Sequence, residues 1–124
     1  MLLITVGYIG FSGMSKTNET LGYIGYNRAA SINLVLQVDR DLQQALVAEK
    51  SLFTVEANSP KFNNLVNDHN ENVSQVETRW SELKTLLTNQ DEISFANKFD
   101  EIFDDWESIS NNIISKISSG VPTE

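Results

Sequence analysis

Apolar side chains recur at spacings of three and four over residues 31–53, SINLVLQVDRDLQQALVAEKSLF, and this periodicity constrains the fold more than any other feature. The stretch contains no Gly or Pro and is rich in good helix formers. Two rows run along it, one made of Val38, Ala45 and Leu52 and the other of Leu36, Leu46 and Phe53. Together they form an apolar stripe too wide for a two-stranded coiled coil. The helix therefore needs neighbours on two sides, as in a helical bundle.

Two more helices are predicted after this one. Ser59-Pro60 is typical of an N-cap residue followed by proline in the first turn, and Ser119-Gly120 is typical of a helix end. We expect helices at about 18–58, 60–88 and 90–118. No stretch alternates apolar and polar residues, so we expect no sheet. The predicted fold class is all-α: an up-down antiparallel bundle of three helices with a long first helix, a four-helix-bundle type that lacks its last helix.

The second and third helical segments carry regular apolar heptads. Their members are Phe62, Val66, His69, Val73, Val76, Trp80, Leu83 and Leu87 in the second segment and Phe95, Phe99, Ile102, Trp106, Ile109 and Ile113 in the third. Trp80 and Trp106 lie on these rows and are expected in the core. Each of the two helices therefore presents an apolar face to its neighbours.

The beginning of the chain is its most apolar part. Residues 1–14, MLLITVGYIGFSGM, carry no charge but are too short to span a bilayer, which needs about 20 residues. They also lack the basic beginning of a signal peptide. We interpret residues 1–15 as the end of a transmembrane helix or as an N-terminal apolar helix segment, and residues 16–124 as one helical bundle domain.

Composition and charge exclude several classes of function. The formal net charge is −8 and the nine Lys and Arg residues are scattered singly, so the chain lacks the basic cluster that nucleic-acid binding needs. The chain has no Cys, which excludes disulfides, thiolate metal sites and a cysteine nucleophile. With 124 residues, 40% of them hydrophobic, it can bury the core of one domain.

The sequence favours neither enzymatic nor metal-dependent chemistry. His69 is the only histidine and has no Glu-x-x-His or His-x-x-x-His spacing, so we interpret it as a hydrogen-bonded interface residue rather than a ligand. We interpret Asp100, Asp104 and their acidic neighbours as a solvated helix face, although a carboxylate cluster could also bind a cation. No phosphate loop, nucleophile elbow or metal signature occurs. We therefore expect no catalytic residue, no metal and no cofactor.

A polar run from Asp39 to Gln44 crosses the apolar stripe of the first helix. Asp39 and Gln43 lie in the second row, and a carboxylate withdrawn from water needs a partner. Arg40 can pair with Asp39 or Asp41 only imperfectly, because adjacent residues on a helix do not face each other. The run therefore predicts a partner from another helix or chain. Both a polar layer that fixes helix register and a layer that contacts a ligand are compatible with it.

At this run the sequence resembles the sensor domains of bacterial methyl-accepting chemotaxis proteins, in the four-helix-bundle group. Many of those carry a word like Asp-Ala-Asp-Arg-Asp-Leu-Tyr-Gln-Ala-Leu-Val-Ala-Glu on the first helix, and residues 37–49 here read QVDRDLQQALVAE. Gln37 replaces the first Asp, and Gln43 replaces the aromatic residue. The layout of an apolar lead-in, a long first helix, two shorter helices and an acidic surface extends the resemblance to the whole chain.

The resemblance implies an extracytoplasmic sensor domain that faces the periplasm from the bacterial inner membrane, forms a homodimer and attaches to the membrane through its N-terminal segment. A small-molecule ligand or a periplasmic binding protein would then displace a helix that leads to the membrane. In such domains arginines on the first helix grip a ligand carboxylate, which implies an anionic ligand here. The candidate ligand-binding residues are Arg40, Asp39, Gln43, Gln44 and Arg28.

Two other functions are compatible with the sequence. The chain could be the sensor of a histidine kinase, which differs only in the sequence downstream of the sensor. It could instead be a structural or adaptor bundle without a ligand. In each case a second copy of the chain or a missing fourth helix would cover the remaining face of a three-helix bundle.

Overall fold

The computed structural model describes the backbone of residues 2–120 and the side chains of residues 20–120. The chain divides into two compact units, residues 1–33 and residues 34–124. In the first unit the described backbone is helical throughout. The large apolar side chains described in that unit are at least half exposed, namely those of Leu21, Tyr23, Ile24, Tyr26 and Ile32. The second unit contains the buried core and the candidate site.

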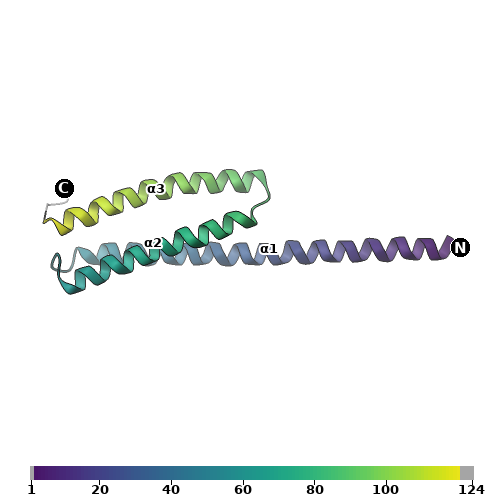
Figure 1. The fold of residues 1–124 in the computed structure, drawn as a ribbon, viewed down its shortest axis with the longest axis horizontal. Helices are drawn as coiled ribbons and strands as arrows, with labels where there is room; N and C mark the ends of the chain where they lie inside the picture. The colour runs from purple at the N-terminus through teal and green to yellow at the C-terminus, as the bar shows by residue number, and fades with distance from the viewer. Residues whose placement is uncertain (1, 121–124) are drawn as a thin grey trace. The chain divides into compact units, whose positions relative to one another are not determined.

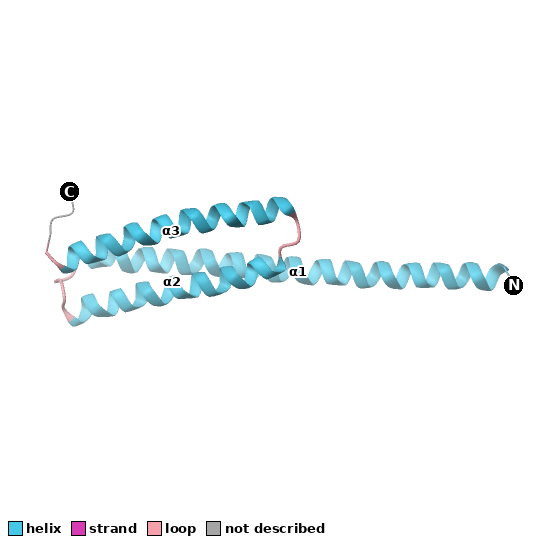
Figure 2. Cartoon of the chain, turned by 45° about the horizontal axis from the view of Figure 1, so that its top comes forward, coloured by secondary structure: helices cyan, strands magenta, loops and turns pink. Residues whose placement is uncertain are grey.

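The described residues form three helices and no strand. The helices are α1 (Leu2–Leu52), α2 (Pro60–Leu86) and α3 (Gln90–Ser118) (Figure 1). Within the second unit, α2 runs antiparallel to α1 and α3 runs antiparallel to α2, with short loops between them (Figure 2). This confirms the predicted all-α class with a long first helix. The second and third helices lie within two residues of their predicted bounds.

The first helix differs from its prediction at both ends, because it begins at Leu2 rather than near Asn18 and ends at Leu52 rather than near Asn58. Beyond Leu52 the chain turns at once, and the amide of Thr54 donates to the carbonyl of Ser51 at 3.1 Å. The hydroxyl of Thr54 donates to the same carbonyl at 2.8 Å. Such local bonds from hydroxyl side chains compete with the helical pattern, and here they end the helix early.

The loop between α1 and α2 is fixed by its own side chains and by α3. Ser59 caps α2, since its hydroxyl accepts a hydrogen bond from the amide of Phe62 at 3.1 Å while Pro60 occupies the first turn. Asn58 has a positive φ of 60°, a conformation that Asn tolerates better than most residues. The side-chain Nδ2 of Asn58 donates to the backbone carbonyl of Ser118 at 2.9 Å, and the Ser118 hydroxyl donates to Asn58 Oδ1 at 2.9 Å. The predicted boundary at Ser59-Pro60 is confirmed.

The core of the second unit is built from one face of each helix. Its buried members are Leu34, Val38 and Ala45 of α1, Val73, Val76, Trp80 and Leu83 of α2, and Ala96 and Phe103 of α3. Aromatic rings extend it along α3, where Phe99 lies against Trp80 with ring centroids 3.9 Å apart. Trp106 packs beside Phe103 at 5.6 Å. The prediction that both tryptophans belong to the core is confirmed for Trp80, whereas Trp106 is partly buried and packs against the core.

Only one of the two apolar rows of α1 enters this core. Val38, Ala45 and Leu52 are buried, whereas Leu36 and Phe53 of the second row are more than half exposed. Periodicity shows that both rows are apolar, but the rotation of α1 depends on where α2 and α3 contact it. Leu36 and Phe53 therefore remain uncovered by the described part of the chain, whereas Leu46 is partly buried beside α3.

The acidic face predicted on α3 is not wholly solvated. Asp100 accepts a hydrogen bond from the indole nitrogen of Trp80 at 2.7 Å and pairs with Lys84 at 3.0 Å. It therefore joins α3 to α2, because a buried indole N–H needs an acceptor. Asp104 and Asp105 are exposed, as predicted.

An apolar groove of about 260 Å³ lies between α1 and α3. Its lining residues are Leu42, Gln43 and Leu46 of α1 and Phe99, Ile102, Phe103 and Trp106 of α3. Phe95, Ile102 and Ile109 of α3 recur every seven residues and are each more than 60% exposed. Side chains of this size at heptad spacing form a helix-packing face that the described residues leave open.

The apolar lead-in falls largely outside the described side chains, because these begin at residue 20. Its backbone is helical from Leu2 onward, as part of α1. Among the residues that the structure describes, no helix is both long enough and apolar enough to cross a membrane. The interpretation of residues 1–15 as the end of a transmembrane helix stays a prediction.

The assigned core predicts that a Val→Ala substitution lowers the free energy of unfolding more at a buried valine than at an exposed one. Val76 is fully buried and Val47 is 63% exposed. Val76→Ala is expected to lower the free energy of unfolding by about 2 kcal/mol, because it removes two buried methyl groups and leaves a cavity. Val47→Ala is expected to change it by less than about 0.5 kcal/mol. Urea unfolding followed by circular dichroism measures both, and equal effects would contradict the assigned core.

Candidate functional site

A buried carboxylate lies at the α1/α2 interface. Asp41 has no exposed surface, and its Oδ1 accepts hydrogen bonds from Arg40 Nε at 3.0 Å and Arg40 Nη2 at 2.9 Å. Its other oxygen, Oδ2, forms an ion pair with Arg79 of α2. An ionised group buried in this way needs opposite charge close by, because removing it from water costs several kcal/mol. Two guanidinium groups therefore share one buried carboxylate.

This pair corrects the prediction for the polar run. The acid that is buried and paired across helices is Asp41, while Asp39 is exposed. The expectation of a partner from another helix is met by Arg79, which lies on α2. Arg40 also reaches its immediate neighbour, because its long side chain can fold back along the helix although the two Cβ atoms diverge. The buried acid is therefore part of the predicted polar run, but it lies on the opposite side of α1 from Asp39.

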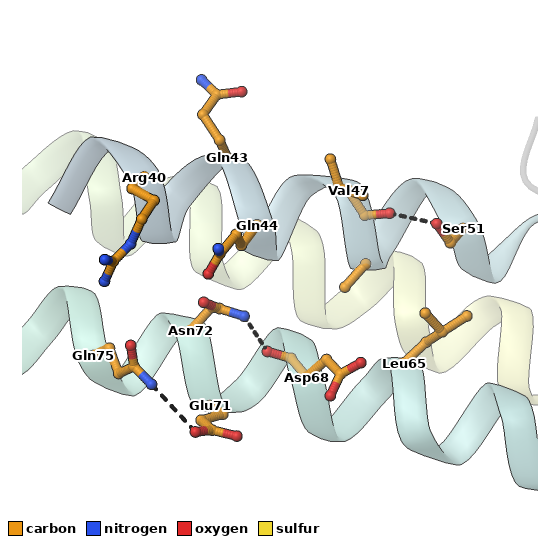
Figure 3. A pocket seen from close by; sticks show the side chains of 11 residues that line it. Arg40, Gln43, Gln44, Val47, Ser51, Leu65, Asp68, Glu71, Asn72 and Gln75 are labelled. Atoms are coloured by element: carbon orange, nitrogen blue, oxygen red, sulfur yellow. Dashed lines mark hydrogen bonds between the residues drawn. The ribbon is translucent and has the colours of Figure 1, made fainter. Parts of the chain in front are cut away.

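A groove of about 710 Å³ lies beside this pair, between α1 and α2. Its lining residues are Arg40, Gln43, Gln44, Val47, Ala48 and Ser51 of α1 and Leu65, Asp68, Glu71, Asn72 and Gln75 of α2. Figure 3 shows the side chains of Arg40 and Gln44 pointing from α1 toward α2, with Asn72 and Gln75 facing them. The side chain of Gln43 points away from α2 in the same view.

The α2 wall of the groove is connected to Asp41 by a ladder of side chains. Arg79 donates to Gln75 Oε1 at 3.0 Å, and Gln75 donates to Glu71 Oε1 at 3.2 Å. These residues are four apart, so they lie on one face of the helix. One turn away, Asn72 donates to the carbonyl of Asp68 at 2.7 Å. Hydrogen bonds and an ion pair therefore run continuously from Glu71 in the groove to Asp41.

A second buried polar layer joins all three helices. Ser110 of α3 donates to Glu49 Oε2 of α1, and its Oγ lies 2.8 Å from His69 Nε2 of α2. His69 Nδ1 lies 3.2 Å from Asn70 Oδ1, so both ring nitrogens of the imidazole face hydrogen-bonding oxygens. Glu49, His69 and Ser110 are each less than 9% exposed. Trp106 covers the imidazole, with ring centroids 6.0 Å apart.

This layer contains a serine, a histidine and a carboxylate, but not in an order that supports hydrolysis. In a catalytic triad the histidine lies between the nucleophilic serine and the acid. Here Ser110 lies between His69 and Glu49, and only 1% of its surface is exposed. The arrangement holds helices together and offers no accessible nucleophile. The interpretation of His69 as a hydrogen-bonded interface residue is confirmed.

The structure separates the residues that the sequence proposed for ligand binding. Arg40, Gln43 and Gln44 all line the α1/α2 groove, whereas Asp39 does not. Arg28 belongs to the unit of residues 1–33, which is distinct from the unit that holds the groove. Their roles in ligand binding stay predictions. In the part of the chain that is described, no group of three or more His, Cys, Asp or Glu residues could hold a metal ion.

Sequence reasoning missed the α2 side of the groove. Asp68, Asn72 and Gln75 flank the heptad row of α2 on the side that faces α1. Their polarity was visible in the sequence, but the same polarity fits a solvated face. Only the pairing of α1 with α2 distinguishes the two interpretations.

The shared carboxylate predicts unequal roles for the two arginines. Arg79→Met is expected to lower the free energy of unfolding by about 3 kcal/mol, because it removes the cation beside Asp41 Oδ2. Arg40→Met is expected to cost less than about 1 kcal/mol, since Arg40 is half exposed and Arg79 remains. Urea unfolding of both variants tests this order. Adding Asp41→Asn to Arg79→Met should recover part of the loss, and a further loss would contradict the assignment.

The second polar layer predicts that one hydroxyl matters and a nearby one does not. Ser110→Ala is expected to lower the free energy of unfolding by about 1–3 kcal/mol, because Glu49 and His69 stay buried without their bridging partner. Ser108→Ala, on an exposed position of α3, is the matched control and should change it by less than about 0.5 kcal/mol. Thermal unfolding measures both variants. A neutral Ser110→Ala would show that the layer contributes nothing to stability.

Comparison with known proteins gives a match at the level of the family. A family model described as a four helix bundle sensory module for signal transduction matches residues 1–124. No curated protein and no solved structure matches the chain. The matched range includes the α1/α2 groove, the α1/α3 groove and both buried polar layers.

Proposed function

Because this chain belongs to the family of four-helix-bundle sensory modules for signal transduction found in methyl-accepting chemotaxis proteins, we propose that it is the extracytoplasmic sensor domain of a chemotaxis receptor. The domain binds a small ligand or a partner protein and transmits a helix displacement to the membrane. In this proposal it faces the periplasm from the bacterial inner membrane, to which the N-terminal segment attaches it. The chain has no catalytic role.

The observation that carries this proposal is the set of directional polar links between the helices. Asp41 and Arg79 join α1 to α2, Ser110 joins Glu49 of α1 to His69 of α2, and Trp80 joins α2 to Asp100 of α3. Apolar contacts tolerate small shifts, but hydrogen-bonded pairs are either formed or broken. A bundle connected in this way favours discrete helix arrangements, which is what a two-state sensor needs.

The α1/α2 groove supports a ligand-binding role. It has space for a small molecule, and its walls combine a guanidinium, carboxylates and amides with apolar side chains. A few polar groups among apolar walls are typical of small-molecule sites. Arg40 connects the groove directly to the buried Asp41, so a bound ligand has a physical means of changing the α1/α2 interface.

The homodimer expected from the sequence is part of the proposal. The open packing face formed by Phe95, Ile102 and Ile109 on α3 supports it, together with Leu36 on α1 and Phe53 in the turn that follows α1. Exposed apolar side chains at heptad spacing are typical of surfaces that another helix covers.

Direct sensing of a small ligand predicts that at least one small molecule stabilises the folded chain. A ligand that binds only the folded state raises the melting temperature, by mass action. We expect a screen of amino acids, organic acids and amines by differential scanning fluorimetry to give a concentration-dependent rise for at least one compound. Isothermal titration calorimetry of that compound provides the independent check. If no compound shifts the melting temperature, direct sensing of a small ligand is contradicted, and sensing through a partner protein or a ligand-free adaptor bundle is favoured.

A further inference from the structure

We propose that the buried layer of His69, Ser110 and Glu49 is a proton-binding site that couples the surrounding pH to the packing of the three helices. The proton is held on the imidazole of His69, and Ser110 links the charged ring to the carboxylate of Glu49. The proton site itself depends on this geometry alone, whereas its use as a signal rests on the sensor function proposed above.

The hydrogen-bond chain through the layer needs one more hydrogen than its uncharged imidazole and hydroxyl supply. Its three links join Asn70 Oδ1 to His69 Nδ1 at 3.2 Å, His69 Nε2 to Ser110 Oγ at 2.8 Å, and Ser110 Oγ to Glu49 Oε2. Each link needs one hydrogen. A neutral imidazole supplies one and the serine hydroxyl supplies one, because amide and carboxylate oxygens carry none. One added proton on the imidazole therefore fills the third link.

The charges around the layer also favour a bound proton. The buried carboxylate of Asp41 is paired with two guanidinium groups. Glu49 is only 8% exposed, yet within the described residues no Lys or Arg side chain pairs with it, and the neighbouring Lys50 is exposed. Because a buried carboxylate needs opposite charge close by, an imidazolium at His69, on the other side of the bridging hydroxyl, meets this need.

The neighbouring groups on α2 and α3 are compatible with a charged ring. From α3 come the hydroxyl of Ser110 and the indole of Trp106, whose ring centroid lies 6.0 Å from that of His69. Aromatic rings attract cations at up to about this distance. The nearest acids along the two helices are Asp68 on α2, which is exposed, and Glu107 on α3, which is partly buried. Both are negative, so both favour a cation at His69.

Loss of the proton weakens the layer that joins all three helices. With a neutral imidazole, one link has two lone pairs facing each other, and Glu49 stays buried without a cation. Histidine side chains change charge between about pH 5 and pH 8. The layer therefore contributes most to stability on the acidic side of this range, and its contribution is lost as the pH rises. A bundle whose helix arrangement depends on this proton changes its arrangement with pH.

Because His69 is the only histidine in the chain, NMR can observe its proton directly. Long-range proton–nitrogen correlation spectra of the full chain report which ring nitrogens carry a hydrogen. We expect both nitrogens to carry one at about pH 6. Glu49→Gln should lower the midpoint pH of proton loss by at least about one unit, because it removes the carboxylate that favours the charged ring. A ring that is neutral from about pH 5 to pH 8, or an unchanged midpoint in Glu49→Gln, would overturn the proposal.

A matched control separates the hydrogen-bonded carboxylate from general negative charge. Glu107→Gln removes a nearby charge on α3 but none of the three links of the layer. It should move the midpoint by less than about half as much as Glu49→Gln does. Circular dichroism checks that each variant is folded. Equal shifts in the two variants would overturn the assignment of the proton to this layer.

Urea unfolding tests whether the proton also couples to helix packing. Between about pH 6 and pH 8.5, the unfolding equilibrium constant of the unaltered chain should rise about tenfold more than that of Glu49→Gln, because the folded layer of the unaltered chain loses a stabilising proton. Equal pH dependence in the two chains would overturn the coupling. A negative result here removes the proton site and leaves the sensor function standing, since the ligand screen tests that function separately.

Discussion

The buried carboxylate of Asp41 determines how α1 and α2 can pack against each other. An ionised group without exposed surface is tolerated only if cationic groups remain beside it. Arg40 can accompany Asp41 wherever α1 moves, because both lie on the same helix, but Arg79 can do so only at one register of α2. A shift of α2 by one helical turn, about 5.4 Å, would break this pair. The apolar core stabilises the packing of the two helices, whereas the ion pair between Asp41 and Arg79 selects their register.

The side of α1 that faces α2 is polar, whereas the side that faces α3 is apolar. On the flank toward α2, Arg79 and the ladder through Gln75 and Glu71 bring polar side chains to the groove. On the flank toward α3, the groove is lined by Leu42, Leu46 and aromatic side chains. The first flank suits a small polar ligand and the second suits another helix. Gln43 is the one residue that lines both of these grooves.

Heptad spacing and capping residues were enough to predict the three helices, because both act over one or two turns of the chain. The rotation of α1 could not be predicted, since two apolar rows on one helix are both compatible with burial. This is why Asp39 was expected at an interface and Asp41 occupies it instead. Arg40 and Gln44 were found from the polar run, but Asp68 and Asn72 were not, because their role depends on which helix lies opposite. Local sequence patterns therefore predict the helices, whereas the residues that line a groove depend on contacts between segments distant in the sequence.

The positions of the two buried polar layers also indicate the kind of motion a ligand would cause. Asp41 and Glu49 both lie on α1, roughly 12 Å apart along the helix axis. The Glu49 layer engages α2 and α3 together through His69 and Ser110, whereas the Asp41 layer engages α2 alone. A ligand that drew Arg40 away from Asp41 would weaken only the Asp41 layer. Because the three-helix layer stays in place, α1 is expected to tilt about the level of Glu49 rather than to slide along its axis.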